Sequence, residues 1–154
     1  MKTYAGFLIS QIRQISGRIF EKILKESGVE EFNGAQGRIL YVLWEHNSLT
    51  ISEIARLTSL ANTTLTSMLG RMEKQSLIER RPDPDNRRQI IITAAEGAEK
   101  LRSEYERVSD LTNEIYYAGF SEEEILLFES MLRRILRNHE NAEQNPSSIK
   151  EENI

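Results

Sequence analysis

The sequence predicts a mainly α-helical fold that carries a small β-wing. Three observations support this. Apolar residues recur at helical spacing over most of the chain, two short helical segments at 51–58 and 62–75 lie close together, and short β-branched segments flank a turn at 82–86. Helix, turn, helix and hairpin in this order form a winged helix-turn-helix, in which the second helix can enter a DNA groove.

Length and composition indicate one ordinary globular domain. The chain has 154 residues, of which 39% are hydrophobic and 29% charged. No segment approaches the ~20 apolar residues that span a bilayer, and the N-terminus lacks the layout of a secretion signal. We therefore expect a cytoplasmic protein without membrane contacts. The absence of cysteine excludes disulfides, thiolate metal sites and thiol-based redox sensing.

Charge is distributed unevenly along the chain. The net charge is −4, but residues 50–93 carry seven basic and five acidic side chains, whereas residues 94–154 carry seven basic and fourteen acidic ones. Local potential governs phosphate binding more than the total charge does. The basic excess lies where a duplex would dock, although a solvated mixture of charges would give the same small excess.

The N-terminal segment predicts two helices. Residues 3–27 form the first, because Leu8, Ile12, Ile15, Ile19 and Ile23 recur at steps of three and four, and Gly28 is a suitable residue to end it. A capping box of Asn33 and Gln36 opens the second, which ends near residues 46–47.

The central segment predicts the winged helix-turn-helix. A capping box of Thr50 and Glu53 opens a helix to about Thr58, residues 59–61 form the turn, and a helix at 62–75 follows. This last helix buries Leu65, Met68, Leu69 and Met72. Strands are expected to begin at 77–78 and to return at 90–92, and two prolines bar a helix from the intervening turn.

The C-terminal segment predicts two further helices and a tail. One helix begins at Thr93 and stops at Gly119, and a capping box of Ser121 and Glu124 opens the other. Residues 141–154 read as a polar tail. We expect a single domain at 1–140, with the winged helix-turn-helix at 50–93 and dimerisation helices at 3–28 and 94–140. The terminal apolar stripes favour pairing with a second copy; a monomeric bundle is the alternative.

The start of the second helix of the motif offers groups that can read bases. Asn can pair with adenine, and Thr can bond a base or phosphate or pack its methyl group on thymine. The candidate DNA-binding residues there are Asn62, Thr63, Thr64, Thr66, Ser67 and, further along the same face, Arg71. N-capping is the structural alternative for Asn62 and Thr63. Ser52 and Arg56, on the preceding helix, are candidates for phosphate contacts, and a solvated surface explains them equally well.

The wing adds Arg87 and Arg88, because narrow A·T-rich minor grooves attract an inserted arginine. The structural alternative is that Asp83 and Asp85 form ion pairs with these arginines. Arg80 and Arg81, at the end of a strand, would only flank the backbone.

Two other functions compete with DNA binding. An enzyme is disfavoured, because His46 and His139 belong to no ligand or nucleophile pattern and no glycine-rich phosphate loop is present. We therefore expect no cofactor and no metal. A winged helix used for protein contacts should show apolar or aromatic anchors where this chain has polar residues 62–64 and the wing arginines.

The order of elements and several motifs resemble the MarR family of bacterial transcriptional regulators. The matching segments are Leu49-Thr50-Ile51-Ser52-Glu53-Ile54-Ala55, Asn62-Thr63-Thr64-Leu65-Thr66, Leu69-Gly70-Arg71-Met72-Glu73-Lys74, Leu77-Ile78-Glu79-Arg80 and the wing from Asp83 to Arg88 followed by Ile92-Thr93. The architecture matches over about residues 3–140. Asn86 stands where the wing of this family usually has Asp before its arginine.

The resemblance implies a homodimer formed by the terminal helices. It also implies binding to a short pseudo-palindrome in double-stranded DNA, often as a repressor that a small ligand releases. Such an effector pocket would lie near Phe7, Ile12, Ile39, Trp44 and Tyr116. Apolar residues at helical spacing more often form core or interface, which is the competing explanation for these five.

Overall fold

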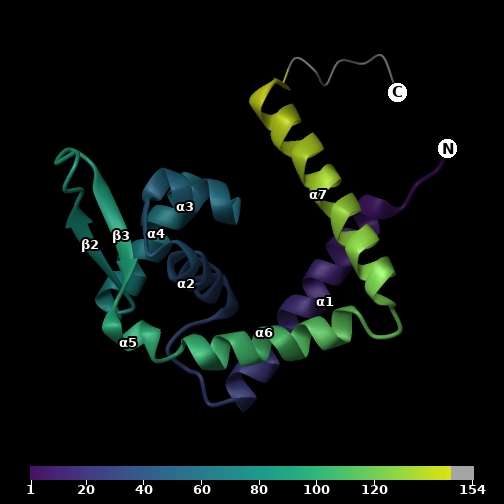
Figure 1. Ribbon diagram of the computed structural model, residues 1–154, viewed down its shortest axis with the longest axis horizontal. Helices are drawn as coiled ribbons and strands as arrows, with labels where there is room; N and C mark the ends of the chain where they lie inside the picture. The colour runs from purple at the N-terminus through teal and green to yellow at the C-terminus, as the bar shows by residue number, and fades with distance from the viewer. Residues whose placement is uncertain (147–154) are drawn as a thin grey trace. The chain divides into compact units, whose positions relative to one another are not determined.

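The computed structural model describes residues 1–146 and has a mainly helical fold with a three-stranded antiparallel sheet (Figure 1). The predicted fold class is therefore confirmed. The elements are α1 (Ala5–Glu26), α2 (Gly34–His46), β1 (Ser48–Thr50), α3 (Ile51–Thr58), α4 (Asn62–Lys74), β2 (Ile78–Pro82), β3 (Ile90–Ala94), α5 (Glu96–Glu99), α6 (Arg102–Tyr116) and α7 (Glu122–Gln144).

The chain forms two compact units. The first spans Met1–Asn113 and the second begins at Glu114. The first unit holds the predicted winged helix-turn-helix: α3, the turn, α4 and the hairpin of β2 and β3. That residues 1–140 behave as a single domain stays a prediction.

All three predicted capping boxes are present. Asn33, Thr50 and Ser121 each accept the backbone N–H of the residue three positions on, and that residue's side chain accepts the N–H of the cap. These reciprocal bonds satisfy donors that a helix start leaves open, so they set where α2, α3 and α7 begin. Gly28 and Gly119 follow α1 and α6 with φ of 77° and 85°, a conformation that favours glycine.

The sheet has the strand order β1-β3-β2. Pro82 pairs with Ile90 next to the loop that closes the wing hairpin, and Ile78 pairs with Ala94 at its base. β1 was not predicted, because three residues are too short to show a periodicity; Ser48 pairs with Thr93 and Leu49 with Ile92. This third strand ties the wing to the segment that leads into α3.

The core of the first unit joins α2, α3, α4 and the sheet. Ile39, Ile54, Leu65 and Ile92 are fully buried within one cluster. Tyr105 on α6 contacts four aromatic rings at centroid distances of 5.6–6.1 Å: Phe20, Phe32, Tyr41 and Trp44. This aromatic cluster connects α6 to α1, α2 and the loop between them.

Two boundaries differ from the sequence prediction. A continuous helix from Thr93 is wrong, because Thr93 and Ala94 belong to β3 and pair with neighbouring strands. The helix begins at Glu96, ends after one turn, and resumes at Arg102. The tail predicted from residue 141 is also too long, since α7 continues to Gln144, and residues 147–154 lie outside the described part of the chain.

The second unit consists of the end of α6, a turn at Gly119 and α7. The hydroxyl of Tyr117 donates to Glu129 Oε1 at 2.9 Å, and the ring of Phe120 contacts those of Tyr117 and Phe128. No described residue of α7 is buried within the single chain. Its large exposed apolar residues include Leu126, Leu127, Met131 and Leu136.

Candidate nucleic-acid interface

The helix α4 separates polar from apolar residues cleanly. Leu65, Leu69 and Met72 are fully buried, and Met68 is nearly so. The six predicted contact residues of this helix are all exposed: Asn62, Thr63, Thr64, Thr66, Ser67 and Arg71. Steps of three and four residues place Thr63, Thr66, Ser67 and Arg71 along one face. The apolar face therefore fixes α4 on the domain and leaves a polar face available to a partner.

The first turn of α4 has no side-chain cap. Its N-cap residue is Ala61, which makes no side-chain hydrogen bond, so the alternative that Asn62 or Thr63 caps this helix is wrong. Both residues belong to the first turn of the helix, and their side chains are exposed. The backbone N–H groups at this end keep their affinity for an anion such as a phosphate.

The preceding helix, α3, presents the two predicted phosphate contacts. Ser52 and Arg56 are both exposed, four residues apart on one helix. The capping box orients this helix: Glu53 Oε2 accepts the backbone N–H and the hydroxyl of Thr50, each at 2.8 Å. The backbone N–H of Thr50 has the largest effect and its hydroxyl the next largest, and together they lower the pKa of Glu53 below its usual value.

The turn between α3 and α4 is tight. Ser59 adopts a left-handed conformation with φ of 53°, and the buried Thr58 donates its hydroxyl to the carbonyl of Ile54 at 2.6 Å. A left-handed residue reverses the chain within a few residues. The two helices are thereby held together, and α3 and α4 form the expected helix-turn-helix.

One ion pair connects α4 to the wing, and the sequence prediction missed it. Arg80 Nε on β2 lies 2.9 Å from Glu73 Oε2 in the last turn of α4. Arg81 on β2 pairs with Glu79 of the same strand. Arg80 therefore links the wing to α4, whereas the pair of Arg81 stays within β2. That these two arginines flank the DNA backbone stays a prediction. A seven-residue separation across a helix end and a strand gives no periodic signal in the sequence.

The tip of the wing is held by hydrogen bonds that leave its arginines unpaired. Asp83 Oδ1 accepts the N–H of Asp85 at 2.9 Å, and Asn86 Oδ1 accepts the N–H of Arg88 at 3.3 Å. Within residues 1–146, neither Arg87 nor Arg88 forms an ion pair, so their predicted pairing with Asp83 and Asp85 is not observed. Both guanidinium groups are exposed and available to an anionic partner.

Two cavities lie in the first unit. One, of about 380 Å³, is bordered by the end of α1, the loop that follows it, the start of α2 and the end of α4. The other, of about 410 Å³, lies between α2 and α6 and includes Tyr41, Tyr105, Ser109 and Asn113 among its lining residues. Burial raises the pKa of the Tyr105 phenol above its ordinary value.

The predicted effector residues line neither of these cavities. Ile39 and Trp44 are buried in α2, and Phe7 and Ile12 are exposed on α1. The indole N–H of Trp44 is buried and is without a hydrogen-bond partner among the described residues. Tyr116 lies in the second unit at the end of α6. The effector assignment of these five residues stays a prediction.

Residues 1–146 show neither a metal site nor a membrane-spanning helix. No group of three or more His, Cys, Asp or Glu side chains there is placed to hold a metal ion. None of the described helices is both long enough and apolar enough to cross a bilayer.

Comparison with protein families and curated proteins gives consistent matches. The model of the MarR family matches residues 32–90. The HTH-type transcriptional regulator FarR of Neisseria gonorrhoeae is 32% identical over 123 residues, which cover 79% of this chain and 77% of FarR. The organic hydroperoxide resistance transcriptional regulator of Bacillus subtilis is 38% identical over 63 residues, covering 41% of this chain and 43% of that protein. The chain thus spans less than half the length of this second relative.

A solved structure extends the match to the whole fold. Mutant MarR from E. coli complexed with operator DNA superposes with a TM-score of 0.75 and 22% sequence identity, over 85% of this chain and 92% of that one. At this identity the similarity establishes the fold.

Proposed function

This chain belongs to the MarR family of DNA-binding transcriptional regulators, and we propose that it acts as a homodimeric repressor of a pseudo-palindromic operator. The family is one of regulators and not of enzymes. The observation that carries the proposal is the exposed polar face of α4, fixed from behind by buried apolar residues.

In the proposed complex, α4 lies in the major groove. Its uncapped N-terminus approaches a phosphate, and Asn62, Thr63 and Thr66 face base edges. Thr64 and Ser67 supply further hydroxyl groups, and Arg71 reaches a base or the backbone from the same helix. Ser52 and Arg56 on α3 contact phosphates, which positions the domain without reading sequence.

The wing extends the proposed contact to the minor groove. Arg87 and Arg88 are exposed and without ion pairs among the described residues, so neither must break a bond before it meets DNA. A narrow A·T-rich groove strengthens the negative potential that attracts an arginine. The pair Arg80–Glu73 supports this arrangement by linking the wing strand to α4.

A second copy of the chain is the proposed partner of the terminal helices. Large apolar residues are exposed at both ends of the chain: Phe7, Leu8, Ile12 and Ile15 on α1, and Leu126, Leu127, Met131 and Leu136 on α7. Exposed apolar residues in this number favour an interface over a solvated surface. A symmetric dimer would also present two copies of α4 to two half-sites.

We also propose that a small ligand releases the protein from its operator. The cavity between α2 and α6 supports it, because it is bordered by the aromatic rings of Tyr41 and Tyr105. Tyr105 also contacts the buried core of α2 through Trp44. A ligand in this cavity would therefore act on a helix that packs directly against α3.

Duplex binding tests the proposed function. Genome-wide mapping of bound sites would identify the operator, and a labelled duplex of that site would then be titrated with protein at several salt concentrations. We expect the association constant to fall steeply with salt, because each neutralised phosphate contributes a slope of about −0.9 on a log–log plot. A winged helix used only for protein contacts is the alternative. Failure to bind any genomic duplex in dilute buffer would favour that alternative and refute ours.

A further inference from the structure

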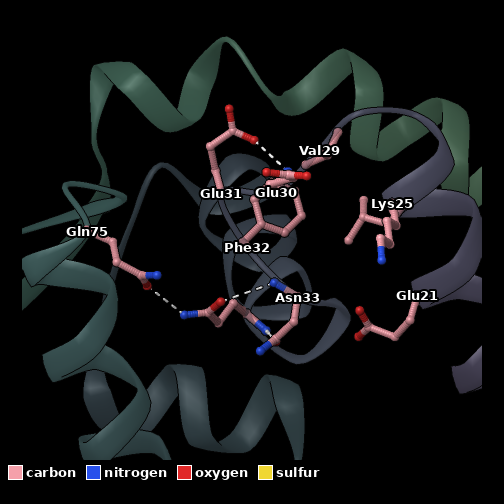
Figure 2. Close-up of a pocket in the computed structure, with 10 residues that line it drawn as sticks. Glu21, Lys25, Val29, Glu30, Glu31, Phe32, Asn33 and Gln75 are labelled. Carbon is pink, nitrogen blue, oxygen red and sulfur yellow. Dashed lines mark hydrogen bonds between the residues drawn. The ribbon is translucent and has the colours of Figure 1, made fainter.

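The cavity at the end of α4 has a buried apolar wall and a polar rim (Figure 2). Leu24, Val29 and Phe32 line it, and all three are buried. Figure 2 shows Glu21 and Lys25, from α1, on one side and Gln75 on the other. With a volume of about 380 Å³, the cavity is large enough for a small molecule that carries an aromatic ring.

A hydrogen bond at this cavity reaches α4, the helix that we propose enters the major groove. Gln36, 8% exposed, donates its amide N–H to Gln75 Oε1 at 2.9 Å, while its own oxygen accepts the backbone N–H of Asn33. Gln75 is the C-cap of α4, and its backbone N–H donates to the carbonyl of Arg71 at 3.0 Å. The capping box of α2 is thus bonded directly to the end of the helix whose exposed face is the proposed DNA-binding surface.

The charges around the cavity favour a cation. Three carboxylates line it, from Glu21, Glu30 and Glu31, against the single ammonium group of Lys25. Glu21 accepts the N–H of Gly34 and Glu31 that of Glu30, whereas the carboxylate of Glu30 has no partner among the described residues. A primary ammonium group has three donors and no acceptor, which suits carboxylate and amide oxygens.

We propose that this cavity binds a small primary amine with an apolar body and that the bound amine weakens DNA binding through Gln75. The apolar body lies against Phe32 and Leu24, and the ammonium group donates to the carboxylates and to Gln75 Oε1. Competition for this oxygen loosens the bond between Gln36 and Gln75 and frees the end of α4. The binding half of the inference stands on the cavity alone; the regulatory half rests on the proposed function.

Binding is tested with three probes that share one ring and differ in charge. Phenethylamine is the cation, phenethyl alcohol the neutral analogue and phenylacetate the anion. In thermal unfolding of the full chain without DNA, we expect phenethylamine alone to raise the midpoint. No shift with phenethylamine, or an equal shift with phenylacetate, would overturn the assignment.

A matched pair of variants locates the site. Glu30→Gln removes the unpartnered carboxylate of the cavity, whereas Glu26→Gln removes an exposed carboxylate of α1 that does not line it. We expect Glu30→Gln to weaken phenethylamine binding about three- to fivefold, as for a partly solvated charge pair, and Glu26→Gln to leave it unchanged. Equal effects of the two changes would show that the amine binds elsewhere.

Coupling to DNA is tested with Gln75→Ala. This variant should bind its operator duplex about three- to tenfold more weakly, because one hydrogen bond that holds α4 is lost, and phenethylamine should weaken it no further. In the unchanged protein phenethylamine should weaken duplex binding. If phenethylamine binds but duplex affinity does not respond, the regulatory half is wrong while the proposed function stands. If no duplex binds at all, the proposed function fails, and the unfolding measurement still decides the binding half.

Discussion

The residues of α4 divide into buried ones, which stabilise the fold, and exposed ones, which are available to a partner. Leu65 and Leu69 are fully buried, whereas Thr66 and Arg71 on the same helix are exposed. Substitutions in the buried set therefore change stability, and substitutions in the exposed set change binding. This division allows the proposed interface to be tested without unfolding the protein.

Removal of one arginine should weaken operator binding and leave the fold intact. We expect Arg71→Ala and Arg87→Ala each to reduce affinity by about 1–3 kcal/mol, because each removes a charged contact to DNA. Fluorescence anisotropy measures the affinity and circular dichroism checks the fold. Arg38→Ala, an exposed arginine on α2, is the control and should have little effect. Unchanged affinity in both variants would refute the residue assignment.

Two glycines should respond in opposite directions to an added methyl group. A Cβ at Gly37 would lie 2.5 Å from Cε2 of Tyr105, so Gly37→Ala should destabilise the fold by about 1–3 kcal/mol. A Cβ at Gly70, in α4, meets nothing within 4 Å, so Gly70→Ala should stabilise it by about 0.5–1 kcal/mol. Urea unfolding measures both. No loss of stability in Gly37→Ala would contradict the packing described around Tyr105, and a loss in Gly70→Ala would contradict the open space described beside Gly70.

At the residue scale the sequence predicted which side chains are buried or exposed better than it predicted which side chains contact each other. The four buried residues of α4 and the exposure of its six candidate contact residues follow from helical periodicity, and both sets were predicted. The contacts of Glu73 with Arg80 and of Gln36 with Gln75 were missed. Each joins two elements, so its geometry depends on tertiary packing, which a spacing in the sequence does not contain.

The helices that begin with a capping box were predicted most accurately. The three capping boxes fixed the starts of α2, α3 and α7. The start at Thr93 was wrong because this residue has a strand partner on each side, Ser48 and Glu79. Pairing with strands that are distant in the sequence overrode the local helical pattern. This pairing cannot be read from the residues around Thr93 alone.

The capping box of α3 should make stability depend on pH. Thr50→Ala removes the hydroxyl that caps this helix and should cost about 0.5–2 kcal/mol near neutral pH. The bonds from Thr50 lower the pKa of Glu53 in the folded state. The contribution of this carboxylate is therefore present above its unfolded pKa and is lost as the pH falls through its folded value.

The difference in unfolding free energy between Thr50→Ala and the unchanged chain should thus shrink below about pH 4. Urea titrations across the acidic range measure this difference. Ser48→Ala, at the start of β1, changes a nearby hydroxyl outside the capping box and serves as the control. A difference between Thr50→Ala and the unchanged chain that grew toward acid would contradict the assigned role of Glu53.

The wing should act as a separable binding element. Replacing residues 83–89 by Asn-Gly keeps the two paired strands and closes the hairpin with a two-residue turn. The variant should fold, lose affinity for its operator and lose any preference for A·T-rich flanks, because Arg87 and Arg88 are gone. Binding to duplexes that differ only in the flanks measures this. An unchanged flank preference would remove the wing from the interface.

At the scale of the whole molecule, charge and apolar surface point to different partners. Residues 94–154 carry most of the negative charge, which suits a part of the protein held away from phosphates. The exposed apolar residues of α1 and α7 lie outside the helix-turn-helix and the wing. The proposed assembly therefore uses the ends of the chain for a second copy and the middle for DNA.

A charge placed on α7 should separate the dimer. Leu126 is 69% exposed in the single chain, and Leu126→Asp would bury a carboxylate if this residue packs against a second copy. Because a symmetric interface repeats the change, we expect the dissociation constant of the dimer to rise about a hundredfold or more. Analytical ultracentrifugation measures this constant. Gln144→Glu adds the same charge at the end of α7 and should leave the dimer intact. A monomer at micromolar concentration in the unchanged chain would contradict the dimer itself.

The dimer also predicts how operator half-sites are spaced. The two copies of α4 in one dimer should meet the major groove one duplex turn apart, about 34–36 Å. Inserting about five base pairs between the half-sites turns one of them to the opposite side of the duplex, so affinity should fall to that of a single half-site. Leu126→Asp should bind the original and the expanded operator equally, since a monomer contacts one half-site at a time. If the unchanged chain also bound both operators equally, its two copies of α4 would not read DNA as a pair.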